Sequence, residues 1–395
     1  MSRPLEGLLV LDCAQFLAGP IAALRLADLG ARVVKVEPPT GEVGRKLYLS
    51  ELAIAGESAL FQTINRGKEG IAVDLKDPDD RARVERLIAE ADVAIMNFRP
   101  GVAERLGLDW ATLSARHPRL VHASLTGYGE TGPWTALPGQ DLLVQARSGL
   151  VWLSGNADDP PTPIGISVVD LHAGALLVQG ILACLVRRGV TGEGGSVQTS
   201  LLEAALDLQV QEITHHLNDG NRPPERSAVA NAHPYLAAPY GIYACAEGWL
   251  ALAMQPLGPL AEALGLPELA GFTPHEAFTR RDEVKALIAR HLPPRPARDW
   301  AADLVARGLW CAEVLTWDRL LASEAAAALD VTREVRWPDG ATLRTTRCPI
   351  RIDGAILDPT GPAPHVGADT ARVLAELDTL PRASVAGAAR GARAP

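Results

Sequence analysis

One carboxylate lies in a stretch where water is expected to be scarce. The sequence "PTPIGISVVDLHAGALLVQGILACL", residues 161–185, places Asp170 between an apolar, strand-like run and an apolar helix. Removing a carboxylate from water is unfavourable unless something compensates. Two roles that do not exclude each other fit this position: we expect Asp170 to be a helix N-cap that binds the amides of the next turn and also a candidate for an ionised, poorly hydrated nucleophile. His172, in the same turn, is either a base or a structural residue.

A second set of candidate residues is cationic. Three segments at the ends of predicted strands carry basic side chains: Arg66, Lys68, Lys76, Arg99 and Arg105. Doubly wound sheets bind ligands at the carboxyl ends of their strands, so these cations are candidates for binding phosphate. Solvated surface charges are the alternative. Neither G-x-G-x-x-G nor G-x-x-x-x-G-K-[ST] follows the first strand, which excludes the usual dinucleotide and P-loop cradles.

The spacing of cysteines, histidines and serines indicates neither a metal site nor a hydrolase. Five cysteines are widely separated and form no C-x-x-C pair, which favours reduced thiols. His215, His216 and His233 have no acidic or thiol partners at ligand spacing. Ser124 and Thr126 lack a G-x-S-x-G context. We therefore expect no metal and no serine hydrolase chemistry.

Composition restricts the class of protein. The chain has 395 residues, 47% of them hydrophobic and 22% charged, which is typical of a soluble globular protein with two or three domains. Its net charge of −9 disfavours nucleic-acid and membrane-surface partners, because both require a basic face. The amino terminus lacks the apolar core of a signal peptide, and no apolar run approaches the ~18 residues of a membrane span. These features predict a cytoplasmic protein with no nucleic-acid or membrane partner.

Alternating strand and helix patterns predict an α/β fold with a parallel sheet covered on both faces. A strand at 8–13, a helix at 21–30 and a strand at 32–37 form the first β-α-β unit, and the alternation returns up to about residue 129. After Asp170 we expect a helix to about Arg188, a strand, and one long helix at 200–218. A hairpin is predicted with Glu247 and Gly248 at its turn.

Breaks in these patterns suggest how the chain is organised. The predicted parts are a large α/β domain at 1–220, a Pro- and Asn-rich linker at 221–235, a small domain at 236–328, a C-terminal segment at 329–380 that returns to the large domain, and a flexible tail at 381–395.

An ordered series of segments resembles one known family. These segments include "GLLVLDCAQFLAGPIAALRLADLGARVVKVEPP", "NRGKEGIAVDLKDPDDR", "NFRPGVAERLGLD", "LVHASLTGYGETGPW", "GQDLLVQARSGL", "GISVVDLHAGALLVQGILACLVRR" and "GGSVQTSLLEAAL". Together they resemble the class III coenzyme A transferases of CaiB/BaiF type, which include formyl-CoA transferases and, as a branch, α-methylacyl-CoA racemases. The resemblance extends nearly to the carboxyl terminus.

The resemblance implies a fold and a reaction. The fold is a Rossmann-like open parallel sheet in a large CoA-binding domain with a smaller α+β domain, assembled as an interlaced homodimer. The reaction moves CoA from an acyl-CoA to a free carboxylic acid, with Asp170 as the nucleophile of an aspartyl mixed anhydride and an aspartyl-CoA thioester. CoA is a substrate, and no tightly bound cofactor is expected. A helix N-terminus or a glycine-rich loop would supply amides for the oxyanion.

The resemblance also assigns binding residues. Matching positions for CoA contacts are Leu17, Ala18, Lys76, Asn97, Phe98 and Arg105, and matching positions for the acyl group are Gln140 and Tyr128. His233, Tyr235 and Tyr240 suggest a small polar or dicarboxylic acyl group, or else they only order the linker.

Two departures from the family pattern are visible. Pro38 and Pro39 occupy the place where some transferases carry an arginine that packs on adenine, and Leu17 replaces a glutamine of the first loop. Racemases typically have a histidine base at the position of Gln140, and glutamine cannot act as a base. Transfer is therefore the preferred interpretation, with α-proton exchange of the racemase type and a non-catalytic CoA-binding protein as alternatives.

Overall fold

The chain forms two compact units. The structure, a computed structural model, describes residues 3–358 and 361–379. The first unit contains residues up to Asp141, residues 168–204 and the described residues from Val331 onward, and the second contains 142–167 and 205–330. This division differs from the one drawn on the sequence, which placed 142–167 and 205–220 in the large domain. The tail predicted at 381–395 lies outside the described residues.

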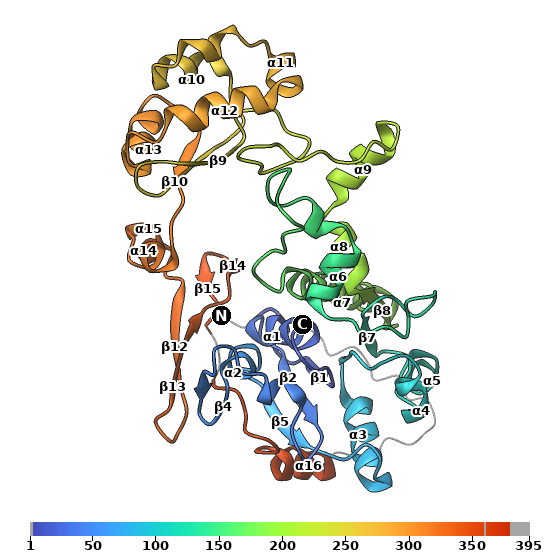
Figure 1. Cartoon of the computed structure of the whole chain (residues 1–395). Coiled ribbons are helices and arrows are strands. Elements are labelled where there is room, and N and C mark those ends of the chain that lie inside the picture. The colour runs from blue at the N-terminus through green and yellow to red at the C-terminus, as the bar shows by residue number, and fades with distance from the viewer. Residues whose placement is uncertain (1–2, 359–360, 380–395) are drawn as a thin grey trace. The chain divides into compact units, whose positions relative to one another are not determined.

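A six-stranded parallel sheet organises the first unit (Figure 1). Its order is β5-β2-β1-β6-β7-β8, all neighbours are parallel, and this is the doubly wound order with its switch point between β1 and β6. The predicted α/β fold is thus confirmed. The strands are β1 (Leu9–Asp12), β2 (Arg32–Glu37), β5 (Glu69–Ala72), β6 (Val93–Met96), β7 (Val121–Thr126) and β8 (Gly195–Ser200).

The two faces of this sheet carry different helices because successive side chains of a strand point to opposite faces. Leu11 and Val34 belong to a core shared with α3 (Pro78–Glu90), α5 (Trp110–Arg116) and α16 (Thr370–Thr379). Their neighbours Asp12 and Lys35 point the other way, toward α1 (Ala18–Asp28). The face under α1 therefore contains buried charges, which an apolar strand pattern alone does not predict.

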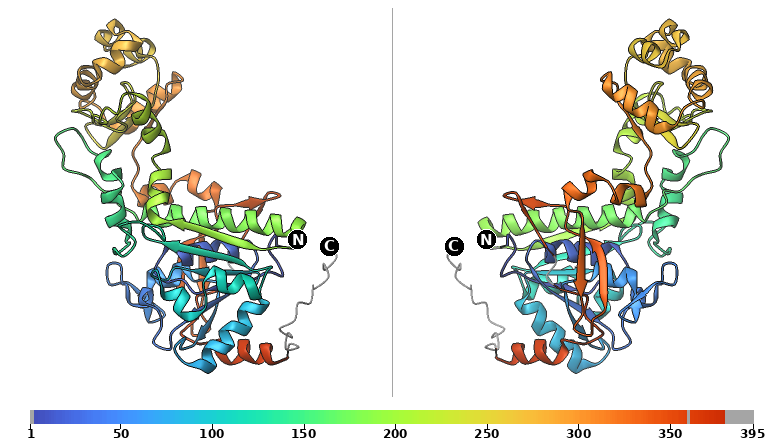
Figure 2. Two further views of the ribbon diagram at one scale, coloured as in Figure 1. Left: turned by 90° about the vertical axis from the view of Figure 1, so that its right-hand side faces the viewer. Right: turned by 90° about the vertical axis from the view of Figure 1, so that its left-hand side faces the viewer.

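The long helix α7 (Val168–Thr191) packs along α1 and against β7 and β8, and Figure 2 shows it as the long green helix over the sheet. Gly174 allows the close contact with α1, because a Cβ there would lie 2.5 Å from Ile21 Cγ2 and 2.8 Å from the Ala18 carbonyl oxygen.

Among the described helices, α7 is long and apolar enough to cross a membrane by length and composition alone. Polar residues such as His172 and Gln179 interrupt the apolar residues of α7, so the sequence shows no uninterrupted apolar run of that length. The packing of α7 on the sheet is that of a core helix.

Smaller elements complete the first unit. The residues after β2 form η1 (Val43–Lys46), the short hairpin β3 (Ala53–Ile54) and β4 (Glu57–Ser58), and α2 (Ala59–Ile64), and α4 (Val102–Leu106) follows β6. The C-terminal residues form the hairpins β12 (Thr332–Arg336) with β13 (Thr342–Thr346) and β14 (Arg351–Ile352) with β15 (Ala355–Ile356).

The second unit has its own apolar core, built on a three-stranded antiparallel sheet. The predicted hairpin is confirmed, since β9 (Gly241–Ala244) pairs with β10 (Trp249–Leu252). The third strand is β11 (Cys311–Glu313). The other elements are η2 (Leu150–Trp152), α9 (Val210–Asn218), α10 (Leu257–Leu264), η3 (Pro267–Gly271), α11 (Pro274–Thr279), α12 (Arg281–His291), α13 (Ala297–Ala306), α14 (Trp317–Leu321) and α15 (Glu324–Leu329).

Two local predictions are wrong. The run before Asp170 forms no strand, and the chain enters α7 directly at Val168. The long helix expected at 200–218 is broken into α8 (Leu201–Asp207) and α9. Helix α6 (Asp141–Arg147) and α8 each span a boundary between the two units.

Candidate active site

A cavity of about 340 Å³ lies at the carboxyl ends of β1, β2, β5 and β6. It is lined by Cys13, Gln15, Val36, Glu37, Pro38, Val73, Asp74, Leu75, Lys76, Phe98, Val102, Arg105 and Leu106. This is the edge at which doubly wound sheets bind ligands, next to the switch point of the strand order. Three of the six residues expected to bind CoA, Lys76, Phe98 and Arg105, thus meet around one cavity.

The cations at this cavity are exposed and have no ion-pair partner among the described residues, which distinguishes them from most basic side chains nearby. Lys76 and Arg105 are both exposed and line the cavity. Two other cations proposed from the sequence are not available to a ligand. Arg66 is buried and lies 2.6 Å from Asp28, and Lys68 is buried 2.7 Å from Asp12. The pairing of these two cations with distant acids could not be read from local sequence.

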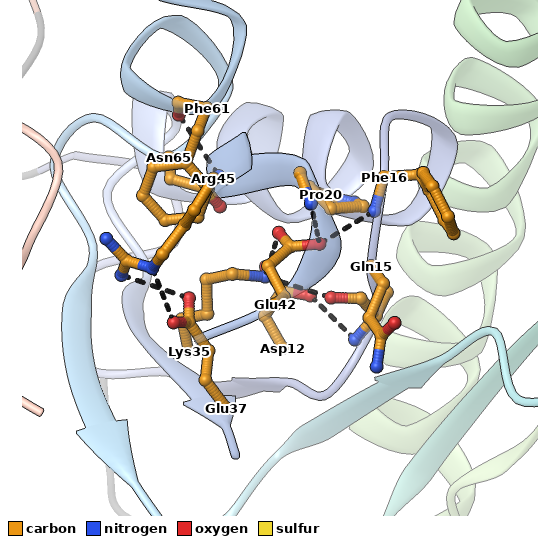
Figure 3. Close-up of polar contacts among 12 residues, drawn as sticks. Asp12, Gln15, Phe16, Pro20, Lys35, Glu37, Glu42, Arg45, Phe61 and Asn65 are labelled. Atoms are coloured by element: carbon orange, nitrogen blue, oxygen red, sulfur yellow. Dashed lines mark hydrogen bonds and ion pairs between the residues drawn. The ribbon is translucent and has the colours of Figure 1, made fainter. Parts of the chain in front are cut away.

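The loop after β1 is held by side chains from three different segments, and Figure 3 shows two of these side chains, those of Asp12 and Glu42. The amide of Ala14 donates to Asp12 Oδ1 at 3.1 Å, that of Gln15 to Asn97 Oδ1 at 2.9 Å, and that of Phe16 to Glu42 Oε2 at 2.9 Å. Asn97 also donates to the Gln15 carbonyl at 2.8 Å. Phe16 has a φ of 64°, a strained conformation for a bulky residue that these hydrogen bonds hold in place.

A cluster of buried charges lies under this loop, and we call Asp12, Lys35, Glu42 and Lys68 the charge cluster. Lys35 Nζ lies 3.1 Å from Glu42 Oε1, and Lys68 Nζ donates to Asp12 Oδ2 at 2.7 Å. Burial opposes ionisation of Asp12, but the two lysines outweigh it, so the pKa of Asp12 lies below its usual value. Burial lowers the pKa of Lys68 to about 8, with Asp12 opposing the shift. In the charge cluster, two lysine side chains therefore face two acidic side chains.

Leu17 and Ala18 lie where this loop becomes α1. Leu17 is the residue before the helix, and Ala18 is its first residue. Neither lines the cavity, but the Ala18 carbonyl faces α7 at Gly174, one turn after Asp170. The loop thus connects the cavity to the helix that carries Asp170.

Asp170 lies in the first turn of α7, partly exposed, and among the described residues no hydrogen bond to its carboxylate is present. Burial, with the charge of Asp141 adding to it, raises the pKa of Asp170 to about 7. Asp141 Oδ2 accepts from the amides of Val169 at 2.8 Å and of Asp170 at 3.0 Å. Asp141 therefore caps α7, and the prediction that Asp170 is itself a cap is wrong.

The positions predicted for the acyl group lie in the segment between β7 and α6. Gln140 is exposed and directly precedes Asp141. Tyr128 is buried, with its ring edge-on to Trp134 at a centroid distance of 5.9 Å. Both follow β7, in the segment that ends at α6.

In the second unit, the histidine and tyrosine singled out near the linker contact each other. His233 Nε2 lies 2.7 Å from Glu212 Oε1, and His233 Nδ1 accepts from the Tyr235 amide at 3.2 Å. The Tyr235 hydroxyl is buried without a hydrogen-bond partner in the part of the chain that the structure describes. No group of three or more potential metal ligands occurs in residues 3–358 and 361–379.

Sequence reasoning missed Asp141 and most of the charge cluster. A usable signal was present in the strand "RVVKVE", where Lys35 stands in an apolar run that must be buried on both faces. A buried lysine requires an acid nearby, but the sequence does not say which acid.

Comparison with known proteins agrees with this geometry. The profile of CoA-transferase family III matches residues 5–370. Succinate–glutarate CoA-transferase of Agrobacterium fabrum is 32% identical over 96% of this chain and 97% of its own, and acetyl-CoA:oxalate CoA-transferase of Acetobacter aceti is 34% identical over 75% and 77%. The crystal structure of a CAIB/BAIF family protein from Brucella suis superposes with a TM-score of 0.83, 31% identity and coverage of 96% and 100%. The chain is therefore an enzyme that belongs to CoA-transferase family III.

Proposed function

We propose that this enzyme transfers CoA from an acyl-CoA to a carboxylic acid through covalent intermediates on Asp170. The observation that carries the proposal is the Asp170 carboxylate, partly withdrawn from water, with no hydrogen bond to it in the described residues and no cation acting on it. A carboxylate in this state is basic and poorly solvated, which are the properties of a nucleophile. A carboxylate that served only to stabilise the fold would be paired or capped.

The reaction conserves the energy of the thioester at every step. The Asp170 carboxylate attacks the thioester carbonyl, the C–S bond breaks, and a mixed anhydride and CoA thiolate form. The thiolate attacks the aspartyl carbonyl, which gives an aspartyl-CoA thioester and releases the donor acid. The acceptor carboxylate then attacks this thioester, and the thiolate attacks the new anhydride at the acceptor's acyl carbon, which restores Asp170. No ATP is consumed, since each bond broken is replaced by one of similar energy.

We assign CoA to the cavity at the strand ends. Lys76 and Arg105 have no ion-pair partner among the described residues, so both ammonium and guanidinium groups are free to bind phosphates. The Phe98 side chain and Pro38 add apolar surface to the same cavity. Asn97, Leu17 and Ala18 contribute through the loop that joins this cavity to α1. The amides of Val169 and Asp170 already donate to Asp141, so we place the oxyanion donors elsewhere.

We propose short dicarboxylic acids as the acyl groups, with Gln140 and Tyr128 in contact with them. The support comes from relatives named for dicarboxylates. Besides the Agrobacterium enzyme, succinyl-CoA–D-citramalate CoA-transferase of Chloroflexus aurantiacus is 36% identical over 70% of this chain. A panel of CoA esters and free acids tests this assignment. A preference for long aliphatic acids would contradict it.

We propose that the enzyme is a homodimer. Helix α7 leaves Val186 73% and Val190 87% exposed, and the segment after η1 exposes Tyr48, Leu49 and Leu52. Exposed apolar side chains that lie close together in sequence, as in each of these two segments, support a surface that another chain covers. Light scattering on dilution tests the proposal, since a folded species of 41.9 kDa would contradict it.

Trapping of the covalent intermediate tests the mechanism. The enzyme is incubated with an acyl-CoA, hydroxylamine is added, and the modified residue is located by mass spectrometry of peptides. Hydroxylamine converts an aspartyl anhydride or thioester to a hydroxamate, which we expect on Asp170. Asp170→Asn is the matched control and should give no adduct. A fully active enzyme without any adduct on Asp170 would overturn the mechanism.

A further inference from the structure

Helix α7 is capped by a residue far away in sequence. The carboxylate of Asp141 accepts hydrogen bonds from the amides of Val169 and Asp170, so one of the two amides is that of the proposed nucleophile itself. Most helix caps come from the residue just before the helix. Here the cap is supplied by the segment that follows β7, and it fixes the backbone at the one position where chemistry is proposed.

Two glycines hold this segment in place. Gly127 follows β7, and Gly139 precedes Asp141 by two residues. A Cβ on Gly139 would lie 2.5 Å from Gly127 Cα, and a Cβ on Gly127 would lie 2.7 Å from Gly139 Cα, so the two backbones touch. The Gly127 carbonyl also accepts from the Leu202 amide at 3.1 Å, at the start of α8. We call this contact of Gly127 with Gly139 the glycine clasp.

We propose that Asp141 is a positioning residue for Asp170: the glycine clasp anchors Asp141 to the end of β7, and its carboxylate fixes the first turn of α7 and places a negative charge beside the nucleophile. This inference rests on the proposed function, in which Asp170 attacks the thioester. It adds a role for Asp141 and for the two glycines that the reaction steps themselves do not require.

Among the described residues, Asp141 is the charged group that acts on Asp170. On α7, His172 lies two positions further along. On α1, which packs on α7, the first charged residue is Arg25, and β8 carries no charged residue. On β7, His122 is buried and bonded to the Leu108 carbonyl. A carboxylate whose nearest charge is another carboxylate is kept basic, and basicity favours attack on a thioester once the group is ionised.

The main test is Asp141→Asn, which removes the charge and keeps an oxygen that can accept from the same amides. Because Asp170 must be ionised to attack, log(kcat/KM) of the parent should rise with pH and level off near pH 7. Asp141→Asn should move this acidic limb to lower pH by about one unit. KM for acyl-CoA should change less than about twofold. An unmoved limb, with activity reduced equally at every pH, would show a purely structural cap and overturn the proposal.

Asp109→Asn is the matched control, because Asp109 caps α5 through the Thr112 amide at 3.0 Å. The acidic limb of log(kcat/KM) against pH in Asp109→Asn should coincide with that of the parent. Hydroxylamine trapping on the parent and on Asp141→Asn distinguishes the positioning role of Asp141 from the proposed function of Asp170. An adduct on Asp170 with an unmoved limb in Asp141→Asn contradicts only the positioning role, whereas a parent without an adduct contradicts the proposed function.

Gly139→Ala tests the glycine clasp without altering any charge. The added methyl meets backbone atoms that must shift, so Asp141 should move relative to α7. We expect kcat to fall about tenfold with KM for acyl-CoA nearly unchanged, since a small misplacement of reacting groups acts on the chemical step. Gly258→Ala is the control, because nothing lies within 4 Å of its added Cβ. Parent-like kcat in Gly139→Ala would show that the clasp does not position the nucleophile.

Discussion

Two regions of the first unit withdraw carboxylates from water, and they treat them in opposite ways. In the charge cluster, Asp12 and Glu42 each face a lysine ammonium within 3.1 Å. At the start of α7, Asp141 and Asp170 face each other, and no cation among the described residues acts on Asp170. The pKa of Asp12 is lowered as a result, whereas the pKa of Asp170 is raised to about 7.

This difference in pKa agrees with two different roles: the charge cluster stabilises the fold, whereas Asp170 is the proposed nucleophile. The charge cluster holds the loop after β1, because Asp12 and Glu42 bind the amides of Ala14 and Phe16 and Lys35 donates to the Ala14 carbonyl at 2.9 Å. Its charges are neutralised and hydrogen-bonded, so they are poor nucleophiles. At the start of α7, Asp141 accepts hydrogen bonds from the helix amides through Oδ2, whereas the Asp170 carboxylate accepts none among the described residues. A buried carboxylate without a cation is unfavourable for the fold and is expected where chemistry needs it.

The largest predicted effect is that of Asp170→Asn on transfer. The substitution removes the anionic oxygen that attacks the thioester, while shape and helix remain. Transfer should fall by several powers of ten, because a covalent route is abolished rather than weakened. Steady-state assays measure the loss, and a CoA-binding assay should show affinity within about threefold of the parent. If Asp170→Asn transferred CoA nearly as fast as the parent, Asp170 would not be the nucleophile, and the proposed difference in role between the two regions would be wrong.

The same comparison predicts a large effect on stability when the charge cluster is broken. Lys35→Met removes the ion-pair partner of Glu42 and leaves that carboxylate buried. Breaking a buried pair on one side typically lowers the free energy of unfolding by about 3–5 kcal/mol. Urea unfolding at one fixed protein concentration measures the change.

Arg83→Met is the control for this substitution, since it breaks the surface pair of Arg83 with Asp80 at 2.6 Å. It should change the free energy of unfolding by less than about 1 kcal/mol. Equal effects of the two substitutions would mean that the charge cluster does not hold the fold.

The third prediction concerns Arg105, a cation of the cavity that belongs neither to the charge cluster nor to the start of α7. Arg105→Ala should raise KM for acyl-CoA about ten- to a hundredfold with a smaller effect on kcat, because a charge-assisted phosphate contact is worth about 1.5–3 kcal/mol. Arg116→Ala, which removes an exposed cation 3.5 Å from Glu85, is the matched control and should leave KM unchanged. An unchanged KM in Arg105→Ala would contradict the proposal that Arg105 binds a phosphate of CoA.

Sequence reasoning predicted the parallel sheet, and it named Lys76 and Arg105, which line one cavity. That Asp170 is the nucleophile stays a prediction. Strand and helix periodicity is local, so the alternation that gives a doubly wound sheet is visible in runs such as "LLVLDC" and "RVVKVE". Lys76 and Arg105 follow strands directly, and the ends of parallel strands meet at one edge of the sheet.

What sequence reasoning missed depends on contacts between distant residues. The bond of Asp141 to the Asp170 amide spans 29 positions, and the pair of Lys68 with Asp12 spans 56. No local pattern distinguishes Lys68, which is buried and paired, from Lys76, which is exposed and free of ion pairs in the described residues. The break between α8 and α9 also has no helix-breaking proline or glycine in "LDLQVQ". Tertiary packing decides each of these features.

The smallest predicted effect is a pH-dependent gain of stability in Asp170→Asn. In the folded parent the pKa of Asp170 is about 7, against 3.8 for an unperturbed aspartate, so the folded state binds this proton more tightly than the unfolded state. Stability of the parent therefore falls as pH rises from about 4 to about 7, whereas asparagine does not titrate. The melting temperature of Asp170→Asn should match that of the parent near pH 4 and exceed it by a few degrees above about pH 7.

Asp109→Asn should behave in the opposite way, because hydrogen bonds from Thr112 lower the pKa of Asp109. Its melting temperature should fall furthest below that of the parent at neutral pH, and the difference should vanish in acid. Melting curves of the three proteins across this range decide the point, and a constant difference between Asp170→Asn and the parent would mean that Asp170 is not a destabilised carboxylate.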